Sequence, residues 1–335
     1  MAKYTIVMSL VPWLILAAAM AAVLLADRLA RRRLPAAALS AVWLGAIPVG
    51  IALGFGVWLH LAYAGHWFGL VGGKISALGP HSRRPMLEYT AGYLLELSLS
   101  ADNIMLLVLL IRSFNVPLAS QGFVLFWAIL GSMILRTALI LTGLALLLKI
   151  PALLYAMGLF VLAAGIAMFF ETDGEERLGQ WLIRLLSRRL PVQDAYEGRR
   201  LIVRRAGRRY ATPLLIVLVL LAVMDMVFAL DSIPAIFGIT RDPLIVVSSN
   251  LFAVLALQSL FFILAPLVDR LRYLQTGLAV ILLFIAMKML LAPLARLVGY
   301  RGHPHIGTGG ALAFISAVLA AAILASLLNP KRANS

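Results

Sequence analysis

Two apolar stretches of the chain, 94–110 and 221–235, carry carboxylates at the same spacing. In each stretch five residues separate two acids, and a small polar residue follows the second acid. The matching residues are Glu96, Asp102 and Asn103 in the first stretch and Asp225, Asp231 and Ser232 in the second. A carboxylate inside hydrocarbon costs a few kcal/mol, so this repeated set of acids indicates a functional site.

The oxygen atoms of this set predict a site for a divalent cation. Carboxylate, amide and hydroxyl oxygens suit Mn²⁺, Ca²⁺ or Mg²⁺, and the chain has no cysteine to hold a softer metal. Several carboxylates in a dry core cannot all stay ionised, so we expect some of them to be protonated without metal. The resulting hypothesis is an exchange of protons for the cation.

Two basic residues inside apolar stretches leave a second interpretation open. Arg136 and Lys288 could pair with the acids and simply hold helices together, although two cations cannot neutralise four acids. Arg136 can equally be interpreted as a static ion-pair partner or as a counter-charge that competes with the metal. Asn250, in a further apolar stretch, could line the cation pathway.

A straight helix would not direct both acids of one stretch at the same ion. Six residues turn a helix by about 600°, which leaves the two side chains about 120° apart. We therefore expect either a local break in the helix or ligands from both stretches. Pro234 offers such a break, because it has no N–H to donate to the carbonyl of Leu230 beside Asp231.

Composition places both stretches in an all-α polytopic membrane protein. Of the 335 residues, 63% are hydrophobic and 13% are charged, and the mean hydropathy is +1.00. A soluble domain is only about 45–50% apolar. Segments long enough to cross a bilayer, about 20 residues, begin with 4–27, which we interpret as a membrane helix and not a removable signal. The nine expected spans are 4–27, 37–63, 88–111, 121–148, 151–170, 212–238, 244–268, 273–293 and 308–328, with 293–307 as a loop.

The distribution of lysine and arginine predicts the orientation in the membrane. Nine alternating spans place nineteen of the 29 basic residues on one side and eight on the other, with two inside spans. The richer side should face the cytoplasm. We therefore expect the N-terminus outside and the C-terminus in the cytoplasm, in the inner membrane of a bacterium. The net charge of +15 follows from this asymmetry and does not indicate nucleic-acid binding.

In this topology the two acid-bearing spans run in opposite directions, as in the inverted repeats of many transporters. The loop before the second repeat contains Gln180–Arg189, whose amphipathic pattern is typical of a helix on the anionic inner leaflet. A regulatory or partner-binding role is the alternative for this loop. The expected regions are an N-terminal two-helix region (1–84), a first repeat (85–170), a basic cytoplasmic loop (171–211), and a second repeat with a C-terminal helix (212–335).

Several motifs between residues 85 and 295 resemble those of a known family. They are Glu96-Leu-Ser-Leu-Ser-Ala-Asp102-Asn103, Leu135-Arg136-Thr137, Asp225-Met-Val-Phe-Ala-Leu-Asp231-Ser232-Ile-Pro234-Ala-Ile, Asp242-Pro243, Ser249-Asn250-Leu-Phe-Ala and the stretch from Gly277 to Lys288. Together they resemble the TerC family of integral membrane proteins, in particular its Alx-like branch. The family is associated with tellurium resistance and manganese export. The resemblance implies that Glu96, Asp102, Asn103, Asp225 and Asp231 form the cation site.

The chain departs from this family at three positions. Many members have a glutamate where this chain has Ala222, an arginine at the position of Gln258, and an asparagine at that of Gly54. The acids of the two repeated stretches remain. These departures therefore bear on ion selectivity and proton coupling.

The sequence favours a secondary carrier that exports Mn²⁺ from the cytoplasm, driven by proton entry and without a resident cofactor. No phosphate-binding Gly-Lys-Ser/Thr motif supports an ATP-driven pump. No nucleophile–base pair supports an enzyme. The alternatives are a carrier of Ca²⁺ and a membrane scaffold that supplies metal to partner proteins. Buried acids would repel tellurium oxyanions, so tellurium resistance would be an indirect effect.

Overall fold

The chain folds into a bundle of helices with one short β-hairpin. The structure is a computed structural model, and it describes residues 10–33, 38–70, 84–170, 196–205, 208–268, 273–297 and 306–329. Within these residues the nine α-helices are α1 (Val11–Arg33), α2 (Ala38–Ala64), α3 (Pro85–Ser113), α4 (Leu118–Lys149), α5 (Leu153–Ala167), α7 (Pro213–Phe237), α8 (Pro243–Val268), α9 (Leu274–Leu297) and α10 (Thr308–Leu328). The hairpin pairs β1 (Ile202–Arg205) with β2 (Arg208–Ala211).

Each expected span coincides with one of these helices, so the all-α polytopic architecture is confirmed. Over the described residues, five helices are long and apolar enough to cross a membrane, namely α2, α4, α7, α9 and α10. Shorter apolar stretches lie in α1, α5 and α8. Many large apolar side chains are exposed, including Leu14 and Ile134 at 65% each, as expected for helices that face lipid. A count of nine membrane crossings stays a prediction.

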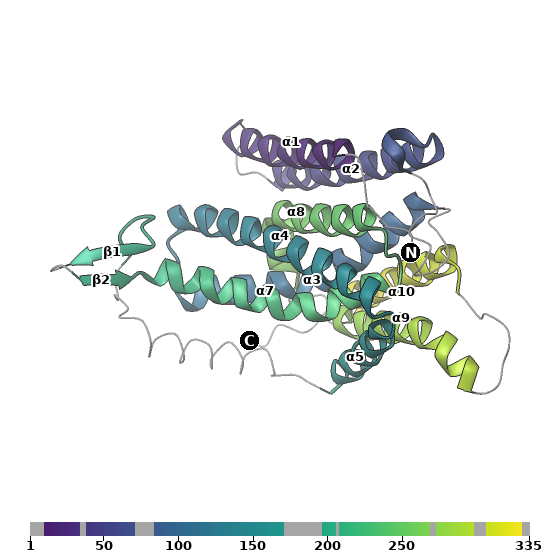
Figure 1. Cartoon of the computed structure of the whole chain (residues 1–335). Helices are drawn as coiled ribbons and strands as arrows, with labels where there is room; N and C mark the ends of the chain where they lie inside the picture. The colour runs from purple at the N-terminus through teal and green to yellow at the C-terminus, as the bar shows by residue number, and fades with distance from the viewer. Residues whose placement is uncertain are drawn as a thin grey trace.

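The helices lie in layers, with the pair α1–α2 covering one side of the bundle (Figure 1). Beneath this pair lies α8, which both helices contact. Every side chain of α8 from Leu244 to Ala256 is at most 5% exposed. This helix is apolar all round, and such helices are buried. It forms the centre of the bundle.

Helices α3 and α7, which carry the repeated acids, run antiparallel. The Thr240 hydroxyl, just after α7, donates a hydrogen bond to Glu88 near the start of α3 (2.6 Å). At the other end, the Tyr196 hydroxyl, which precedes α7, donates to the carbonyl of Phe114 just after α3. We call this second end the hairpin end and the first the far end of the bundle.

Helices α5 and α9 form a second antiparallel pair with close glycine contacts. A Cβ placed on Gly158 would lie 3.1 Å from Met289, and one on Gly165 would lie 3.1 Å from Leu283. The three-helix units α3–α4–α5 and α7–α8–α9 therefore place two of their corresponding helices in opposite directions. This arrangement agrees with the inverted repeat that the sequence predicts.

Helices α3 and α8, by contrast, both begin at the far end and pack closely along their length. A Cβ on Gly92 would lie 2.9 Å from the Ser249 hydroxyl oxygen and 2.9 Å from a methyl group of Ile236. Only glycine allows this approach without a shift of its neighbours. The close approach fixes the position of α3 along the axis of α8.

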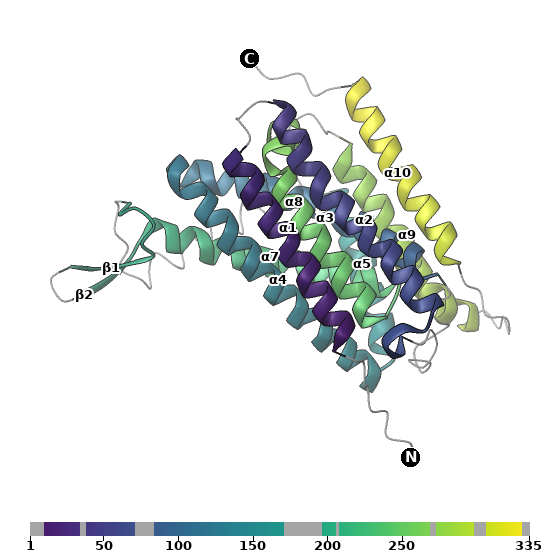
Figure 2. The same ribbon diagram turned by 90° about the horizontal axis from the view of Figure 1, so that it is seen from above.

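The β-hairpin extends beyond α7 at one end of the molecule (Figures 1 and 2). Thr212 joins it to α7, because its hydroxyl lies 2.8 Å and 3.0 Å from the carbonyl oxygens of Arg200 and Leu201. The sequence analysis expected only a loop over 171–211, so the hairpin is a correction. The expected amphipathic helix at Gln180–Arg189 lies outside the described residues.

The structure bears on two prolines: α7 passes through Pro234 within the expected span 212–238, whereas the loop expected from residue 293 is corrected. Helix α7 continues through Pro234 to Phe237, so the proline removes one hydrogen-bond donor without ending the helix. Helix α9 continues through Pro293 to Leu297, into the stretch expected as a loop. In both helices the proline falls within the final turns, where fewer residues remain to be disrupted.

Candidate cation site

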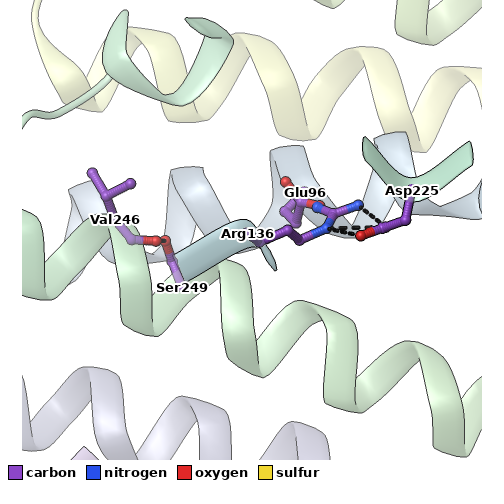
Figure 3. A network of polar contacts seen from close by, with 5 residues as sticks. All are labelled: Glu96, Arg136, Asp225, Val246 and Ser249. Carbon is purple, nitrogen blue, oxygen red and sulfur yellow. Dashed lines mark hydrogen bonds and ion pairs between the residues drawn. The ribbon is translucent and has the colours of Figure 1, made fainter. Parts of the chain in front are cut away.

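Arg136 joins two acids from different helices in the interior of the bundle (Figure 3). Its Nη1 atom forms an ion pair with Glu96 of α3. Its Nη2 atom lies 2.9 Å from Oδ1 of Asp225 in α7, and its Nε atom lies 3.2 Å and 3.4 Å from the two oxygens of that carboxylate. Glu96 and Asp225 are the first acids of the two repeated stretches.

These charges are almost entirely withdrawn from solvent. The side chains of Arg136 and Glu96 are 1% and 2% exposed, and that of Asp225 is 16% exposed. Removing ions from water costs several kcal/mol for each ion, and only good geometry and further hydrogen bonds offset that cost. One guanidinium facing two carboxylates leaves this trio one positive charge short of neutrality. The site therefore favours an additional cation or a proton.

The trio lies near a division between two apolar cores. One core contains Leu99, Met133 and Ala229, and the other, nearer the hairpin end, contains Leu110, Leu125 and Met224. Asp225 follows Met224 directly and precedes Ala229 by four residues, so it lies where α7 passes from one core to the other. A polar site between two apolar cores disrupts less apolar packing than one inside either core.

Among the buried polar groups without a hydrogen-bond partner within the described residues are those of two residues predicted from the sequence, one in α7 and one in α8. They are the Ser232 hydroxyl, on a residue 1% exposed, and both amide atoms of Asn250, which is fully buried. An unsatisfied buried polar group costs about 1–3 kcal/mol, and few such groups occur in native proteins. Ser232 is a predicted ligand and Asn250 a predicted pathway residue. Both could supply oxygen atoms to a cation.

The remaining predicted ligands are only partly described. Asp231 lies half-buried in α7 and has an interaction partner. Asp102 and Asn103 lie in α3, but their side chains are outside the described residues. Among the side chains that are described, no three acids or histidines gather as a metal site. Convergence of all four acids on one ion therefore stays a prediction.

A second polar cluster at the far end was missed by the sequence analysis. We define this far-end cluster as Tyr63, Glu88, Thr240 and Asp242. Tyr63 donates to Asp242 (2.5 Å), Thr240 donates to Glu88 (2.6 Å), and the backbone N–H of Asp242 lies 3.4 Å from the Thr240 hydroxyl. Glu88 precedes Glu96 by two helical turns, a spacing that could have revealed it.

Asp242 also caps α8. Its Oδ1 atom accepts hydrogen bonds from the backbone N–H groups of Leu244 (3.0 Å) and Ile245 (3.3 Å), as an N-cap residue does. Burial raises the pKa of the Asp242 carboxyl from its ordinary value, while these hydrogen bonds and that from Tyr63 oppose the rise. Lys288 of α9 interacts favourably with the charge of Glu88.

Two of the three departures from the family pattern lie at exposed positions. Ala222 and Gly54 are exposed on α7 and α2, and a Cβ on Gly54 would meet nothing within 4 Å. The side chain of Gln258 is not described. Ala222 precedes Asp225 by three residues, so a glutamate there would be a neighbour of that acid on the surface of α7.

Comparison with known proteins agrees with this architecture. A family model described as "Integral membrane protein TerC family" matches residues 81–334. The chain is 37% identical to the uncharacterized membrane protein STKORF319 of Myxococcus xanthus over 295 residues, which cover 88% of this chain and 82% of that protein. No solved structure matches the chain.

Two relatives carry more specific names. The putative membrane-bound redox modulator Alx of Escherichia coli K12 is 43% identical over 206 residues, covering 61% of this chain and 64% of that protein. The thylakoid membrane protein TERC of Arabidopsis thaliana is 39% identical over 243 residues, covering 72% and 61%. The family match covers most of the chain and includes every residue of the trio. The chain therefore belongs to the TerC family of integral membrane proteins.

Proposed function

We propose that this chain is a secondary transporter that exports a divalent cation, with Mn²⁺ as the expected substrate, in exchange for protons. Glu96, Asp102, Asn103, Asp225, Asp231 and Ser232 would supply the ligands. Asn250 would line the pathway. The proposal extends to the cytoplasmic membrane of a bacterium, with the N-terminus outside and the C-terminus inside.

The observation that carries the proposal is the pairing of Arg136 with Glu96 and Asp225. Acids from two oppositely directed helices meet at one positive charge in the interior. A cation that enters this position would take the place of the guanidinium, and Arg136 would return when the cation leaves. The guanidinium thus keeps the empty site close to neutral, which lowers the cost of buried acids.

Proton exchange follows from the same charge balance. A divalent cation brings two positive charges to acids that already hold one guanidinium. Protonated members of the set would lose their protons as the metal binds, since a nearby cation favours the ionised carboxylate. Protons entering from outside would then displace the metal. Manganese prefers such oxygen ligands, as calcium does.

The name of the Alx relatives, membrane-bound redox modulator, fits this proposal as a downstream effect. This chain has no cysteine, so it cannot itself exchange thiols for disulfides. A redox effect would therefore arise from the metal it transports. Tellurium resistance would be indirect for the same reason, because buried acids repel oxyanions.

The test is Mn²⁺ binding to the purified full chain, from mildly acidic to mildly alkaline pH. Wild-type protein should bind more tightly as the pH rises, because protons compete for the ligands. Glu96→Gln and Asp225→Asn should each weaken binding by about tenfold or more, equivalent to about 1.4 kcal/mol. Glu197→Gln is the control, because it neutralises an acid that precedes β1 and belongs neither to the trio nor to the helices.

Transport itself is then measured as Mn²⁺ uptake into inside-out vesicles whose lumen is more acidic than the medium, so that protons leaving the lumen drive Mn²⁺ in. Wild type should accumulate Mn²⁺, and the combined Asp102→Asn and Asp231→Asn variant should not. Equal uptake by both would refute the ligand assignment. If Ca²⁺ displaces Mn²⁺ at lower concentration than Mn²⁺ displaces Ca²⁺, the substrate is calcium. Absence of binding to either ion would reject both carriers.

A further inference from the structure

The far-end cluster lies along the same face of α3 as the cation site. Glu88, Gly92 and Glu96 are four residues apart, so they form one stripe on the helix. Two obstructions close this stripe between the far end and Glu96. One is the hydrogen bond between Thr240 and Glu88, and the other is the contact of Gly92 with Ser249 and Ile236.

The hydrogen bonds of the cluster join parts of the chain that belong to different units. Glu88 belongs to the first three-helix unit, Thr240 and Asp242 to the α7–α8 turn of the second unit, and Tyr63 to α2. In transporters built from inverted repeats, one unit moves against the other. Bonds across the units at one end must therefore break when that end opens.

The hairpin end is closed in a different way. There the two units meet through apolar side chains, among them Leu110, Leu125, Leu214 and Val217. Among the described residues, the hydrogen bonds at that end, such as that from Tyr196 to Phe114, go to backbone carbonyls and join neither unit to a buried acid. Polar contacts are directional and are replaced by water when broken, whereas apolar packing loses free energy in proportion to exposed area. Breaking the hydrogen bonds at the far end should therefore cost less free energy than separating the apolar contacts at the hairpin end, because water can replace the lost hydrogen bonds.

The charges around the cluster are consistent with a closure that is stable while dry. Lys288 of α9 interacts favourably with the charge of Glu88, and Arg241 is the neighbour of Asp242 in the sequence. Tyr63 faces both acids from α2. Helices α8 and α10, which also pack against α3, carry no ionisable side chain. The hydroxyl donors Tyr63 and Thr240 therefore hold the two acids, and Lys288 adds a favourable charge near Glu88.

We propose that the far-end cluster of Tyr63, Glu88, Thr240 and Asp242 is the extracytoplasmic gate of the transporter, closed in this structure. The inference rests on the proposed transport function, and on the far end facing outward. Opening breaks the Tyr63–Asp242 and Thr240–Glu88 hydrogen bonds and separates α3 from the α7–α8 turn. Water and the cation then reach the stripe that leads to Glu96.

The test uses the natural absence of cysteine. Ser249→Cys places one thiol at the inner of the two obstructions, behind the Thr240–Glu88 hydrogen bond and at a fully buried position, where a membrane-impermeant thiol reagent added to intact cells reports opening. In this background the combined Tyr63→Phe and Thr240→Val variant removes both donors and keeps the side-chain shapes. Its labelling rate should rise by about tenfold, since each lost hydrogen bond shifts the equilibrium severalfold.

Two controls make the result specific. Thr90→Val removes a hydroxyl from the same helix that bonds only to the Met86 carbonyl within that helix (2.7 Å), and it should leave labelling unchanged. Trp67→Cys, in an exposed turn beyond α2, should be labelled equally in all variants. The melting temperature of each purified variant shows whether the fold is retained.

The proposal is overturned if the double variant melts at a lower temperature with no rise in labelling, because the cluster is then only a structural contact. It is also overturned if Thr90→Val raises labelling equally. The readout involves no metal, so it is independent of the substrate. Failure of Mn²⁺ binding would reject the proposed function. The labelling rates would still show whether the far-end cluster opens.

Discussion

At the scale of residues, Arg136 decides how the acids can coexist. Its neighbours Glu96 and Asp225 could be selected from the sequence, because carboxylates in apolar stretches stand out by their cost. The identity of the partner of Arg136 could not, since spacing along the chain does not reveal which helices are adjacent. For the same reason the hydrogen bond between Thr240, in the α7–α8 turn, and Glu88, in α3, could not be predicted from the sequence (2.6 Å).

Replacing Arg136 by Gln should destabilise the protein strongly. Removing one partner of a buried ion pair costs about 3–5 kcal/mol, and here two carboxylates lose it. Mn²⁺ should stabilise this variant more than it stabilises wild type, because the metal replaces the missing charge and binds only the folded form. The measurement is the melting temperature with and without Mn²⁺.

The matched control is Lys149→Gln, which removes an exposed positive charge from the same helix. It should change neither the melting temperature nor the effect of Mn²⁺. Equal stabilisation of wild type and Arg136→Gln by Mn²⁺ would show that the guanidinium and the metal do not share a position.

At the scale of elements, helix positions followed from hydropathy, because a bilayer imposes a length on each apolar segment. The β-hairpin could not be predicted from hydropathy. Its strands are too short and too basic for an alternating pattern to be recognised, since each has four residues, Ile202–Arg205 and Arg208–Ala211. The passage of α7 through Pro234 agrees with the expected span 212–238. The continuation of α9 beyond Pro293 was missed, since a proline lowers helix stability without fixing where a helix ends.

The contact between α3 and α8 yields a prediction at this scale. Gly92→Ala should lower stability by about 1–3 kcal/mol, as overpacking usually does, because its Cβ would lie 2.9 Å from Ser249 and Ile236. Gly131→Ala is the matched helix substitution, since a Cβ there meets nothing within 4 Å. It should be neutral or gain up to about 1 kcal/mol. Equal melting temperatures for the two variants would mean that α8 moves aside readily.

At the scale of the whole molecule, the oppositely directed units were predicted from charge distribution and spacing alone. The contacts at the two ends of α3 and α7 agree with that prediction. The order of layers, with α1 and α2 over α8, could not be predicted, because all these helices are similarly apolar. Only the specific fit of side chains distinguishes one neighbour from another.

The orientation of the whole molecule can be measured with single cysteines. Ile202→Cys, 55% exposed in the hairpin, should react with an impermeant reagent only after the cytoplasmic side is opened. Trp67→Cys, 46% exposed beyond α2, should react in intact cells. The excess of basic residues on the hairpin side is the physical reason. The reverse pattern of reactivity would show that the molecule lies the other way in the membrane.

The pairing of Arg136 with acids from both units also has a consequence for biogenesis. During synthesis α3 emerges with Glu96 before α4 supplies Arg136, and Asp225 follows only with α7. Moving an unpaired carboxylate into the bilayer costs free energy. We therefore expect α3 to leave the translocon together with α4, as a pair of helices. The buried arginine would then already be in place to receive α7, and the order of the helices along the chain would itself guide membrane insertion.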